Sequence, residues 1–390
     1  MDTKVQIKSR YIVAAATLLA LIFVTFITAC DKSDRSVSLL AQNQTFQQAG
    51  NNTFSQNQVD VLWVVDNSSS MDTSQANLAN NYASFITQFQ TLGFDYHMAV
   101  TTTDAYLANS YFNNAMSDYQ PTIAQFRDGF VGQFGLGLSG ITVMTSQNTT
   151  SSIFQKNMSE GTSGSGDERA FSSFVQALSD PTNTNSGFRR SSAFLAIIIL
   201  SDEDDFSGNA SFCDHFDSAC ATTSTSYVGD HNFTVQEPEL HTVSYYTSWL
   251  DNYVGNHSNY SVSSIFTDTS SCLTTLNQND PSTSRIIAQR YPAMATATSG
   301  VSSSLCGNFN NILTNISQSI ISLASVFTLN APANPSTIAV TVNGVSVPND
   351  PTNGWTFNAT TNAVSFHGTA IPPAGATINI TYTPTSALNN

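Results

Sequence analysis

Short apolar segments alternate with amphipathic segments between residues 58 and 328, and this alternation limits the possible folds more than any other feature of the chain. Residues 59–65 are mostly apolar and β-branched, and residues 193–200 form the most apolar strand-like run. Residues 76–92 and 308–327 carry apolar side chains at helical spacing. Buried strands alternating with amphipathic helices predict a doubly wound, mostly parallel α/β sheet that is covered on both faces.

Further segments extend this pattern along the chain. We expect additional strands over residues 95–102, 141–145 and 261–267, and helices over residues 151–158, 167–178, 243–254 and 285–298. Two stretches interrupt the alternation, residues 104–140 and 206–240, and we expect both to be insertions near one end of the sheet.

The pattern changes after the long helix near the C-terminus. Pro332 and Pro335 indicate a linker, and Asn343-Gly344 between two short alternating runs predicts a β-hairpin. We therefore expect a small all-β domain over residues 329–390, with strands over 337–342, 345–348, 355–357, 363–366 and 377–382. A domain of this size is difficult to stabilise alone, so we expect it to pack on the α/β domain or on a partner.

The N-terminal residues 1–29 have the features of a bacterial export signal. Lys4, Lys8 and Arg10 precede an uncharged apolar run that ends in small residues just before Cys30. A Cys at this position resembles the bacterial lipobox, whose Cys is lipidated after cleavage. The alternative is an uncleaved transmembrane helix, because the apolar run is long enough to span a bilayer. Either interpretation predicts a membrane tether.

Residues 30–57 are polar and rich in Gln and Asn, which predicts a flexible tether between the anchor and the α/β domain. Together with the export signal, this predicts a protein of the bacterial cell envelope. We expect it to be lipid-anchored, at the periplasmic face or the cell surface. The choice between the inner and outer membrane stays open.

Four cysteines remain when the one at the anchor is set aside. They are Cys213, Cys220, Cys272 and Cys306, and an even number in an exported chain predicts two disulfides. Three pairings are possible in principle. We favour Cys213–Cys220 and Cys272–Cys306.

The charge balance excludes one class of partner. Only 10% of the residues are charged, and removal of residues 1–29 leaves nine Lys and Arg against 26 Asp and Glu, a formal net charge of −17. Such an acidic chain does not attract nucleic acid. An acidic surface is compatible with cation binding.

Polar residues with oxygen ligands follow the two most apolar strands. The first strand leads into Asp66-Asn67-Ser68-Ser69-Ser70, a DxSxS motif, and the strand over 193–200 leads into Ser201-Asp202. A third polar loop, residues 161–166, precedes a predicted helix. Ligands bind beyond the carboxyl ends of strands in open α/β sheets, so we expect these segments to meet there. Carboxylates and hydroxyls are hard ligands suited to Mg²⁺ or Mn²⁺.

This combination resembles the von Willebrand factor type A domain and its metal-ion-dependent adhesion site. The resemblance implies that Ser68 and Ser70 bind the metal directly, while Asp66 and Asp202 act mainly through water. It also implies a direct threonine ligand from the third loop. Thr162 has the right chemistry, whereas Ser165 lies closer to the expected distance from the helix, and both remain candidates.

In this family one coordination position stays open for an acidic group of a partner. The resemblance therefore implies a non-enzymatic binding or adhesion module that captures a protein ligand through Mg²⁺ or Mn²⁺, with Ca²⁺ as an alternative. We interpret Asp204 and Asp205 as a solvated acidic loop, with a second Ca²⁺ site as the alternative. The competing function is a structural cell-envelope protein with a degenerate, metal-free domain. No GxSxG, P-loop or HExxH motif occurs, so no catalytic residues are predicted.

Overall fold

The computed structural model describes most of the chain after the N-terminal region. The described residues are 42–47, 58–109, 120–180, 184–208, 240–281, 285–373 and 376–385. The predicted signal peptide, the predicted lipidation site Cys30 and the predicted pair Cys213–Cys220 therefore lie outside the described residues. Among the residues that are described, no helix has the length and apolar character needed to cross a membrane.

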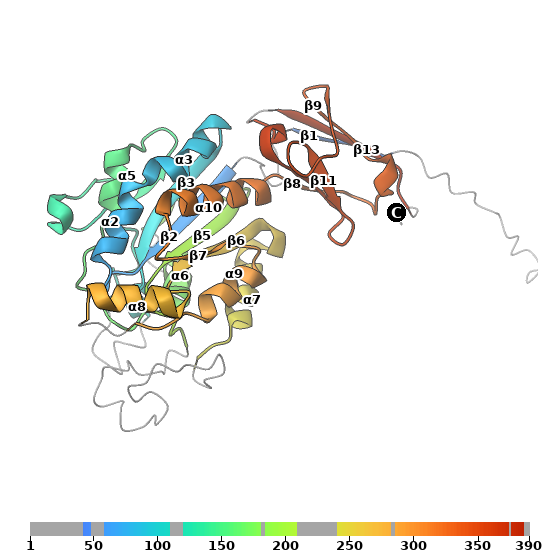
Figure 1. The fold of residues 1–390 in the computed structure, drawn as a ribbon. Helices are drawn as coiled ribbons and strands as arrows, with labels where there is room; N and C mark the ends of the chain where they lie inside the picture. The colour runs from blue at the N-terminus through green and yellow to red at the C-terminus, as the bar shows by residue number, and fades with distance from the viewer. Residues whose placement is uncertain are drawn as a thin grey trace, which may run out of the picture.

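A six-stranded sheet forms the centre of the larger unit, with the strand order β4-β3-β2-β5-β6-β7 (Figure 1). The strands are β2 (Gln58–Val65), β3 (Asp95–Thr102), β4 (Val143–Thr145), β5 (Phe194–Leu200), β6 (Tyr260–Phe266) and β7 (Ser302–Ser304). All neighbours pair in parallel except β4, which is antiparallel to β3 at one edge. The predicted doubly wound, mostly parallel α/β class is confirmed.

Helices cover both faces of this sheet (Figure 1). They are α2 (Asp72–Asn80), α3 (Tyr82–Thr91), α5 (Ser151–Asn157), α6 (Ala170–Ser179), α7 (Val243–Val254), α8 (Ser270–Asn279), α9 (Arg290–Ala297) and α10 (Phe309–Leu323). Within β2, Val61 and Trp63 pack in one hydrophobic cluster with residues of α3 and α10. Leu62 and Val64 pack in another with residues of α6, α7 and α9. Alternate side chains of one strand thus enter two separate cores, as a doubly covered strand requires.

Three helical segments differ from the prediction, and in one of them, predicted over residues 285–298, the helix α9 begins only at Arg290. The segment predicted as one helix over residues 76–92 is two helices, because Asn81 leaves the helical conformation between α2 and α3. Helix α8 was not predicted. Only Cys272 of this helix is buried, so its sequence lacks the apolar periodicity that identifies an amphipathic helix.

A second unit is built from short antiparallel strands. Its two sheets have the orders β1-β13-β9-β10 and β11-β12-β8. The strands are β1 (Gln42–Gln47), β8 (Val326–Thr328), β9 (Ala339–Val342), β10 (Val345–Val347), β11 (Trp355–Asn358), β12 (Ala363–Phe366) and β13 (Thr377–Tyr382). Asn343 and Gly344 both have positive φ between β9 and β10, which confirms the predicted Asn-Gly hairpin.

Strand β1 lies inside residues 30–57, the segment predicted to be a flexible tether throughout. It pairs along its whole length with β13, from Gln42 opposite Tyr382 to Gln47 opposite Thr377. That part of the tether prediction is therefore wrong. Phe46 is the one apolar residue in β1, and a strand at a sheet edge is held mainly by backbone hydrogen bonds that hydrophobic patterning does not reveal.

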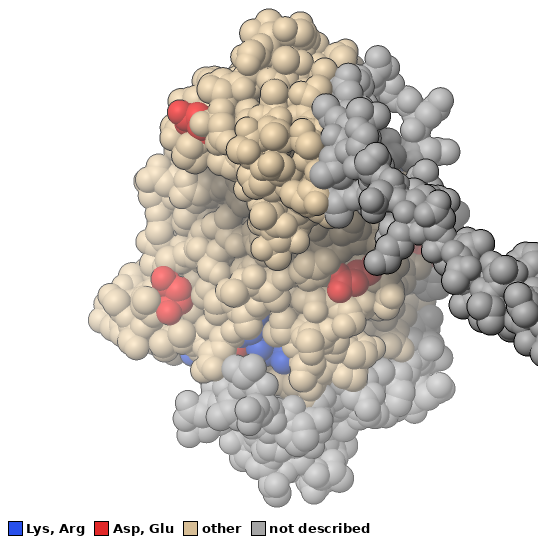
Figure 2. Space-filling model, turned by 90° about the vertical axis from the view of Figure 1, so that its right-hand side faces the viewer, with Lys and Arg blue, Asp and Glu red and all other residues tan. Residues whose placement is uncertain are grey.

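The small β unit packs against the α/β unit. Trp355 and Val364 belong to the same continuous hydrophobic cluster as Ile316 and Ile320 of α10, so one apolar core connects the two units. Figure 2 shows that charged side chains are few and scattered over the described part of the face that it presents. The described residues of that face form no basic patch of the kind that binds nucleic acid.

Candidate metal-ion site

The DxSxS loop begins where β2 ends and is fixed to the end of β5. The Asp66 N–H donates to the Leu200 carbonyl at 2.9 Å, which continues the parallel pairing for one more residue. The two carboxylate oxygens of Asp66 accept from the Ser68 N–H and the Ser201 hydroxyl, each at 2.8 Å. Asp66 is completely buried, and its carboxylate connects the DxSxS loop to the loop that follows β5.

Hydroxyl groups connect this loop to Asp202. The Ser68 and Ser70 hydroxyls lie 3.1 Å apart, and the Ser70 hydroxyl donates to Asp202 Oδ1 at 3.0 Å. Asp202 is buried beyond the end of β5, whereas Ser70 is half-buried. The structure thus brings four predicted site residues together: Asp66, Ser68, Ser70 and Asp202.

The third predicted segment docks on the DxSxS loop. The buried Gln75 side chain donates from Nε2 to the carbonyls of Asp66 and Gly161, both at 2.8 Å. The Gly164 N–H donates to the Asn67 carbonyl at 2.8 Å. A Cβ atom on Gly164 would lie 2.5 Å from Asn67 Cγ, so only glycine permits this approach.

Thr162 and Ser165 do not join the four residues. Neither has a hydrogen bond to any of the four, and Ser165 is engaged elsewhere. Its N–H donates to Asp104 Oδ1 at 3.0 Å, and its hydroxyl accepts from the Asp167 N–H at 3.0 Å. The loop therefore reaches the site, while the two side chains proposed as its metal ligands are not hydrogen-bonded to it.

Two buried glutamates adjoin the site and were missed from the sequence. Glu168 is 1% exposed, and neither of its carboxylate oxygens has a hydrogen-bond partner. Its backbone carbonyl accepts from the Phe206 N–H at 2.8 Å, which places it beside the loop after β5. Glu203 follows Asp202 directly and donates its N–H to the Ser201 hydroxyl at 3.2 Å. The sequence does place both glutamates in short acidic stretches between apolar segments. Hydrophobic periodicity alone does not show that such acidic residues are buried.

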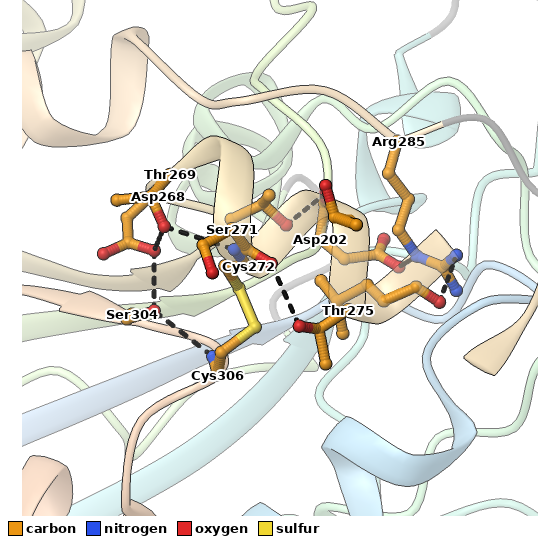
Figure 3. The surroundings of a disulfide bond; sticks show 12 residues. Asp202, Asp268, Thr269, Ser271, Cys272, Thr275, Arg285, Ser304 and Cys306 are labelled. Carbon is orange, nitrogen blue, oxygen red and sulfur yellow. Dashed lines mark hydrogen bonds and ion pairs between the residues drawn. A yellow bond between two sulfur atoms is a disulfide. The ribbon is translucent and has the colours of Figure 1, made fainter. Parts of the chain in front are cut away.

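Among the described residues, Arg285 is the cation that contacts the site, and it was also missed from the sequence. Its Nε donates to Asp202 Oδ2 at 2.5 Å, and its Nη1 donates to the Asp280 carbonyl at 3.0 Å beyond the end of α8. Figure 3 shows this pair beside the disulfide that joins Cys272 of α8 to Cys306. The predicted Cys272–Cys306 pairing is confirmed.

Burial makes all four acids difficult to ionise. Burial raises the pKa of Asp66 from 3.8 to about 7, and the neighbouring Asp202 adds to the shift against hydrogen bonds from Ser68 and Ser201. Burial also raises the pKa of Asp202, although Arg285 and Ser70 oppose the shift. Without a further cation, the carboxyls of the site tend to keep protons.

The two glutamates are shifted further. The pKa of Glu168 is raised well above 4.5 by burial and then by the charges of Glu203, Asp66 and Asp202. The pKa of Glu203 is raised well above 4.5 by burial and then by Asp202 and Asp66. The four buried carboxyls of Asp66, Glu168, Asp202 and Glu203 therefore interact with one another. Among the described residues, Arg285 pairs with one of them, Asp202. Buried acids are stable when paired with a cation, so this site has a deficit of positive charge.

Asp204 and Asp205 differ from the prediction of a solvated loop, which is wrong. Both are buried, with exposed fractions of 2% and 0%. Asp204 accepts from the backbone N–H groups of Gln289 and Arg290, and Asp205 pairs with the Arg290 guanidinium at 3.1 Å. Both acids are therefore satisfied by donors within the fold.

No protein-family model and no curated protein matches this chain. Solved structures similar to it include the proximal thread matrix protein 1 of the mussel byssus, with 11% identity and a TM-score of 0.36 over 71% of this chain and 50% of that one. One structure of that protein has a zinc-occupied MIDAS motif. The pilus adhesin SpaC of Lactobacillus rhamnosus GG has 13% identity and a TM-score of 0.35 over 88% and 40%.

The pilus adhesin RrgA of Streptococcus pneumoniae has 10% identity and a TM-score of 0.29 over 87% of this chain and 57% of that one. The chain thus spans about half the length of these proteins. Likenesses of this size carry no statement about function, which has to come from the residues of the site.

The residues of the site fit a hard divalent cation. Ser68 and Ser70 offer hydroxyl oxygens, Asp66 and Asp202 offer carboxylates, and Glu168 has a buried carboxylate without a donor. Among the described residues, no set of three or more His, Cys, Asp or Glu side chains is arranged to hold a metal by itself. A cation here would accordingly depend on the serine hydroxyls as well as on the acids.

Proposed function

We propose that this protein is a non-enzymatic binding module that captures a protein partner through a divalent cation, Mg²⁺ or Mn²⁺, at the ends of β2 and β5. The observation that carries the proposal is the continuous chain of oxygen contacts from Ser68 through Ser70 to Asp202, with Asp66 buried beneath it. Two segments distant in sequence, residues 66–70 and 201–202, supply oxygen atoms to one small region, and among the described residues Arg285 on Asp202 is the one cation paired with these acids.

Each residue has a distinct role in this proposal. Ser68 and Ser70 would hold the cation directly, while Asp66 and Asp202 would balance its charge and orient water around it. The cation would supply the positive charge that attracts an acidic side chain of the partner. The exposed position of Ser69 and the half-buried Ser70 support access from solvent.

A cleft beside the site offers room for the partner. It has a volume of about 530 Å³ and is lined in part by Asn67, Ser163, Gly164 and Phe130. The segment that begins at Phe130 also exposes large apolar side chains, namely Phe130, Val131, Phe134 and Leu138. Exposed apolar side chains next to a polar anchor point are typical of protein interfaces, because they contribute buried area around a central contact.

We further propose that the module acts at the bacterial cell envelope. Lipidation of Cys30 would tether it to a membrane at the periplasmic face or the cell surface, and the acidic chain would bind a protein partner and no nucleic acid. These proposals rest on the sequence features of residues 1–57 and on the charge balance.

Metal titration of the folded chain tests the proposal. We expect calorimetry to detect Mg²⁺ or Mn²⁺ binding by the wild-type protein and at least about a tenfold loss of affinity in Ser68→Ala and Ser70→Ala, because each removes one proposed ligand. Asp66→Ala should abolish binding, with circular dichroism checking that the fold is retained. Ser69→Ala is the matched control, since its exposed side chain belongs to the same loop and should leave the affinity unchanged.

A pull-down from envelope extract, with and without EDTA, extends the same experiment to the partner. Wild type and Ser69→Ala should retain a protein ligand only in the presence of the cation, and Ser70→Ala should lose it. A wild-type protein without measurable affinity for any divalent cation would contradict the proposal. That result would favour a structural envelope protein with a degenerate, metal-free domain.

A further inference from the structure

We infer that Glu168 supplies the direct metal ligand of the third segment, in place of Thr162 or Ser165. The inference rests on the proposed divalent-cation function and specifies how this chain carries it out. It departs from the family resemblance, which implies a neutral hydroxyl at that place.

The state of the Glu168 side chain is the first argument. The residue is 1% exposed, and neither of its carboxylate oxygens has a hydrogen-bond partner of normal geometry; its side chain interacts with that of another acid, Glu203. A buried acid that faces another acid costs free energy, and native proteins rarely retain such a pair unless an ion, a proton or water satisfies it. The adjacent Arg169 pairs with Asp167 at 2.6 Å, and the charges that act on Glu168 are those of other acids.

The position of Glu168 is the second argument. Its carbonyl accepts from the Phe206 N–H at 2.8 Å, which fixes it against the loop that begins with Asp202. Four residues earlier in the chain, the Gly164 N–H is bound to the Asn67 carbonyl of the DxSxS loop. The segment from Gly164 to Glu168 thus contacts both loops that carry the other proposed ligands, the DxSxS loop at its start and the loop after β5 at its end.

The alternatives in the third segment are less suitable. The Ser165 hydroxyl already accepts from the Asp167 N–H, and its backbone N–H is committed to Asp104. Thr162 is half-buried and has no hydrogen bond to Asp66, Ser70 or Asp202. The charges that act on Glu168, by contrast, are those of Glu203, Asp66 and Asp202, which are the acids of the site itself.

A carboxylate ligand changes what the site does. It adds a negative charge that a threonine would not, so the site should hold its cation more tightly and leave less positive charge for the partner's acid. A carboxylate can also bind through both oxygens, which suits Ca²⁺ as well as Mn²⁺. Binding of both ions should therefore depend on this residue.

Glu168→Gln tests the inference because it removes the charge and keeps the size. With the full chain at pH 8, we expect at least about a tenfold loss of Mn²⁺ and Ca²⁺ affinity by calorimetry. Thr162→Ala and Ser165→Ala should each change the affinity less than about threefold. Glu160→Gln is the matched control, because Glu160 is also buried but pairs with Arg127 at 3.0 Å, and its substitution should leave the affinity unchanged.

Thermal unfolding separates a ligand from a structural residue. In EDTA, Glu168→Gln should unfold at the same or a higher temperature than wild type, since it removes an unpaired buried acid. In saturating Mn²⁺ it should lose most of the stabilisation that wild type gains. Glu168→Asp keeps the charge and should retain an affinity between those of wild type and Glu168→Gln.

The possible failures point to different conclusions. Unchanged Mn²⁺ affinity in Glu168→Gln, with loss in Thr162→Ala or Ser165→Ala, would overturn the assignment of Glu168 and leave the proposed function standing. Destabilisation of Glu168→Gln by the same amount with and without Mn²⁺ would show a structural role and also overturn the assignment. Absence of divalent-cation binding in wild type would overturn both proposals.

Discussion

Two groups of acidic residues lie near the carboxyl end of β5, one made of Asp204 and Asp205 and the other of Asp202 and Glu168, and they are satisfied in different ways. Asp204 and Asp205 accept hydrogen bonds from backbone N–H groups and pair with Arg290, so the fold provides their partners. Asp202 has Arg285, but the adjoining Glu168 has no hydrogen-bond partner of normal geometry, and its side chain interacts with that of another acid, Glu203. Both groups are buried and both contain an arginine, so burial and charge pairing alone do not distinguish them.

The difference lies in the supply of donors. Asp205 is bonded to the Phe171 N–H at the first turn of α6 and to the Ser207 hydroxyl, which makes it part of the scaffold that positions α6. Glu168 precedes the same helix and receives nothing comparable. An acid that accepts hydrogen bonds from donors of the chain supports the fold. A buried acid that lacks such donors and lies beside other acids indicates a place for a cation.

The largest effect should come from breaking the satisfied group. Asp205→Ala leaves the Arg290 guanidinium buried without its carboxylate and removes the acceptor of the Phe171 N–H. We expect the free energy of unfolding to fall by about 3–5 kcal/mol, as when one partner of a buried ion pair is removed. Urea denaturation of the metal-free protein measures this.

The same variant also sharpens the comparison. If it remains folded, Asp205→Ala should bind Mn²⁺ like wild type, because Asp205 has no role in the proposed site. A loss of Mn²⁺ affinity that exceeds the loss explained by unfolding would mean that the two acidic groups form one functional unit.

This division could not be predicted from the sequence. Residues 202–205 appear as one acidic run, and the buried state of Asp204 and Asp205 depends on donors from residues 289–290, which are distant in the chain. The DxSxS motif and Asp202, in contrast, could be placed because each directly follows an apolar strand of a predicted parallel sheet. The side chains that complete the site, Glu168 and Arg285, depend on loop packing that periodicity does not encode.

The fold itself followed more closely from the sequence. The central strands are apolar on both faces and α10 has a continuous apolar stripe, so period and length identified them. The short strand β1 and the mostly exposed helix α8 lack such patterns, and tertiary pairing decides their structure. Sequence reasoning therefore succeeded where burial sets the pattern and failed where hydrogen bonds to distant segments do.

Addition of the cation should give the second-largest effect on the free energy of unfolding. This effect should depend on the site around Asp202 and Glu168 and not on Asp204 and Asp205. Mn²⁺ at about 100 times its dissociation constant should stabilise the wild-type protein by about 2.7 kcal/mol, because it binds the folded state. Thermal or urea unfolding with Mn²⁺ or EDTA measures the difference. Ser70→Ala should show a much smaller gain, and Glu160→Gln should show the full gain. Equal stabilisation of Ser70→Ala and wild type would place the cation elsewhere.

The pH dependence of that gain should be the smallest of these effects. The pKa of Asp66 is about 7 in the folded protein, against 3.8 ordinarily, and the pKa values of Glu168, Asp202 and Glu203 are raised as well. Between these values the folded state binds more protons than the unfolded state, so the metal-free protein should lose stability as the pH rises from about 4 through about 7.

A cation opposes this loss because it binds the deprotonated carboxyls. The stabilisation by saturating Mn²⁺ should therefore grow by about 1 kcal/mol or more between pH 5 and pH 8, which corresponds to about one pKa unit of one acid. Asp204 and Glu160 also have raised pKa values, about 6 and about 7, but they contribute equally with and without Mn²⁺ and cancel in the difference. A gain that is the same at both pH values would show that the acids beside Asp66 are already ionised without the cation, and that the deficit of positive charge at the site is smaller than the structure implies.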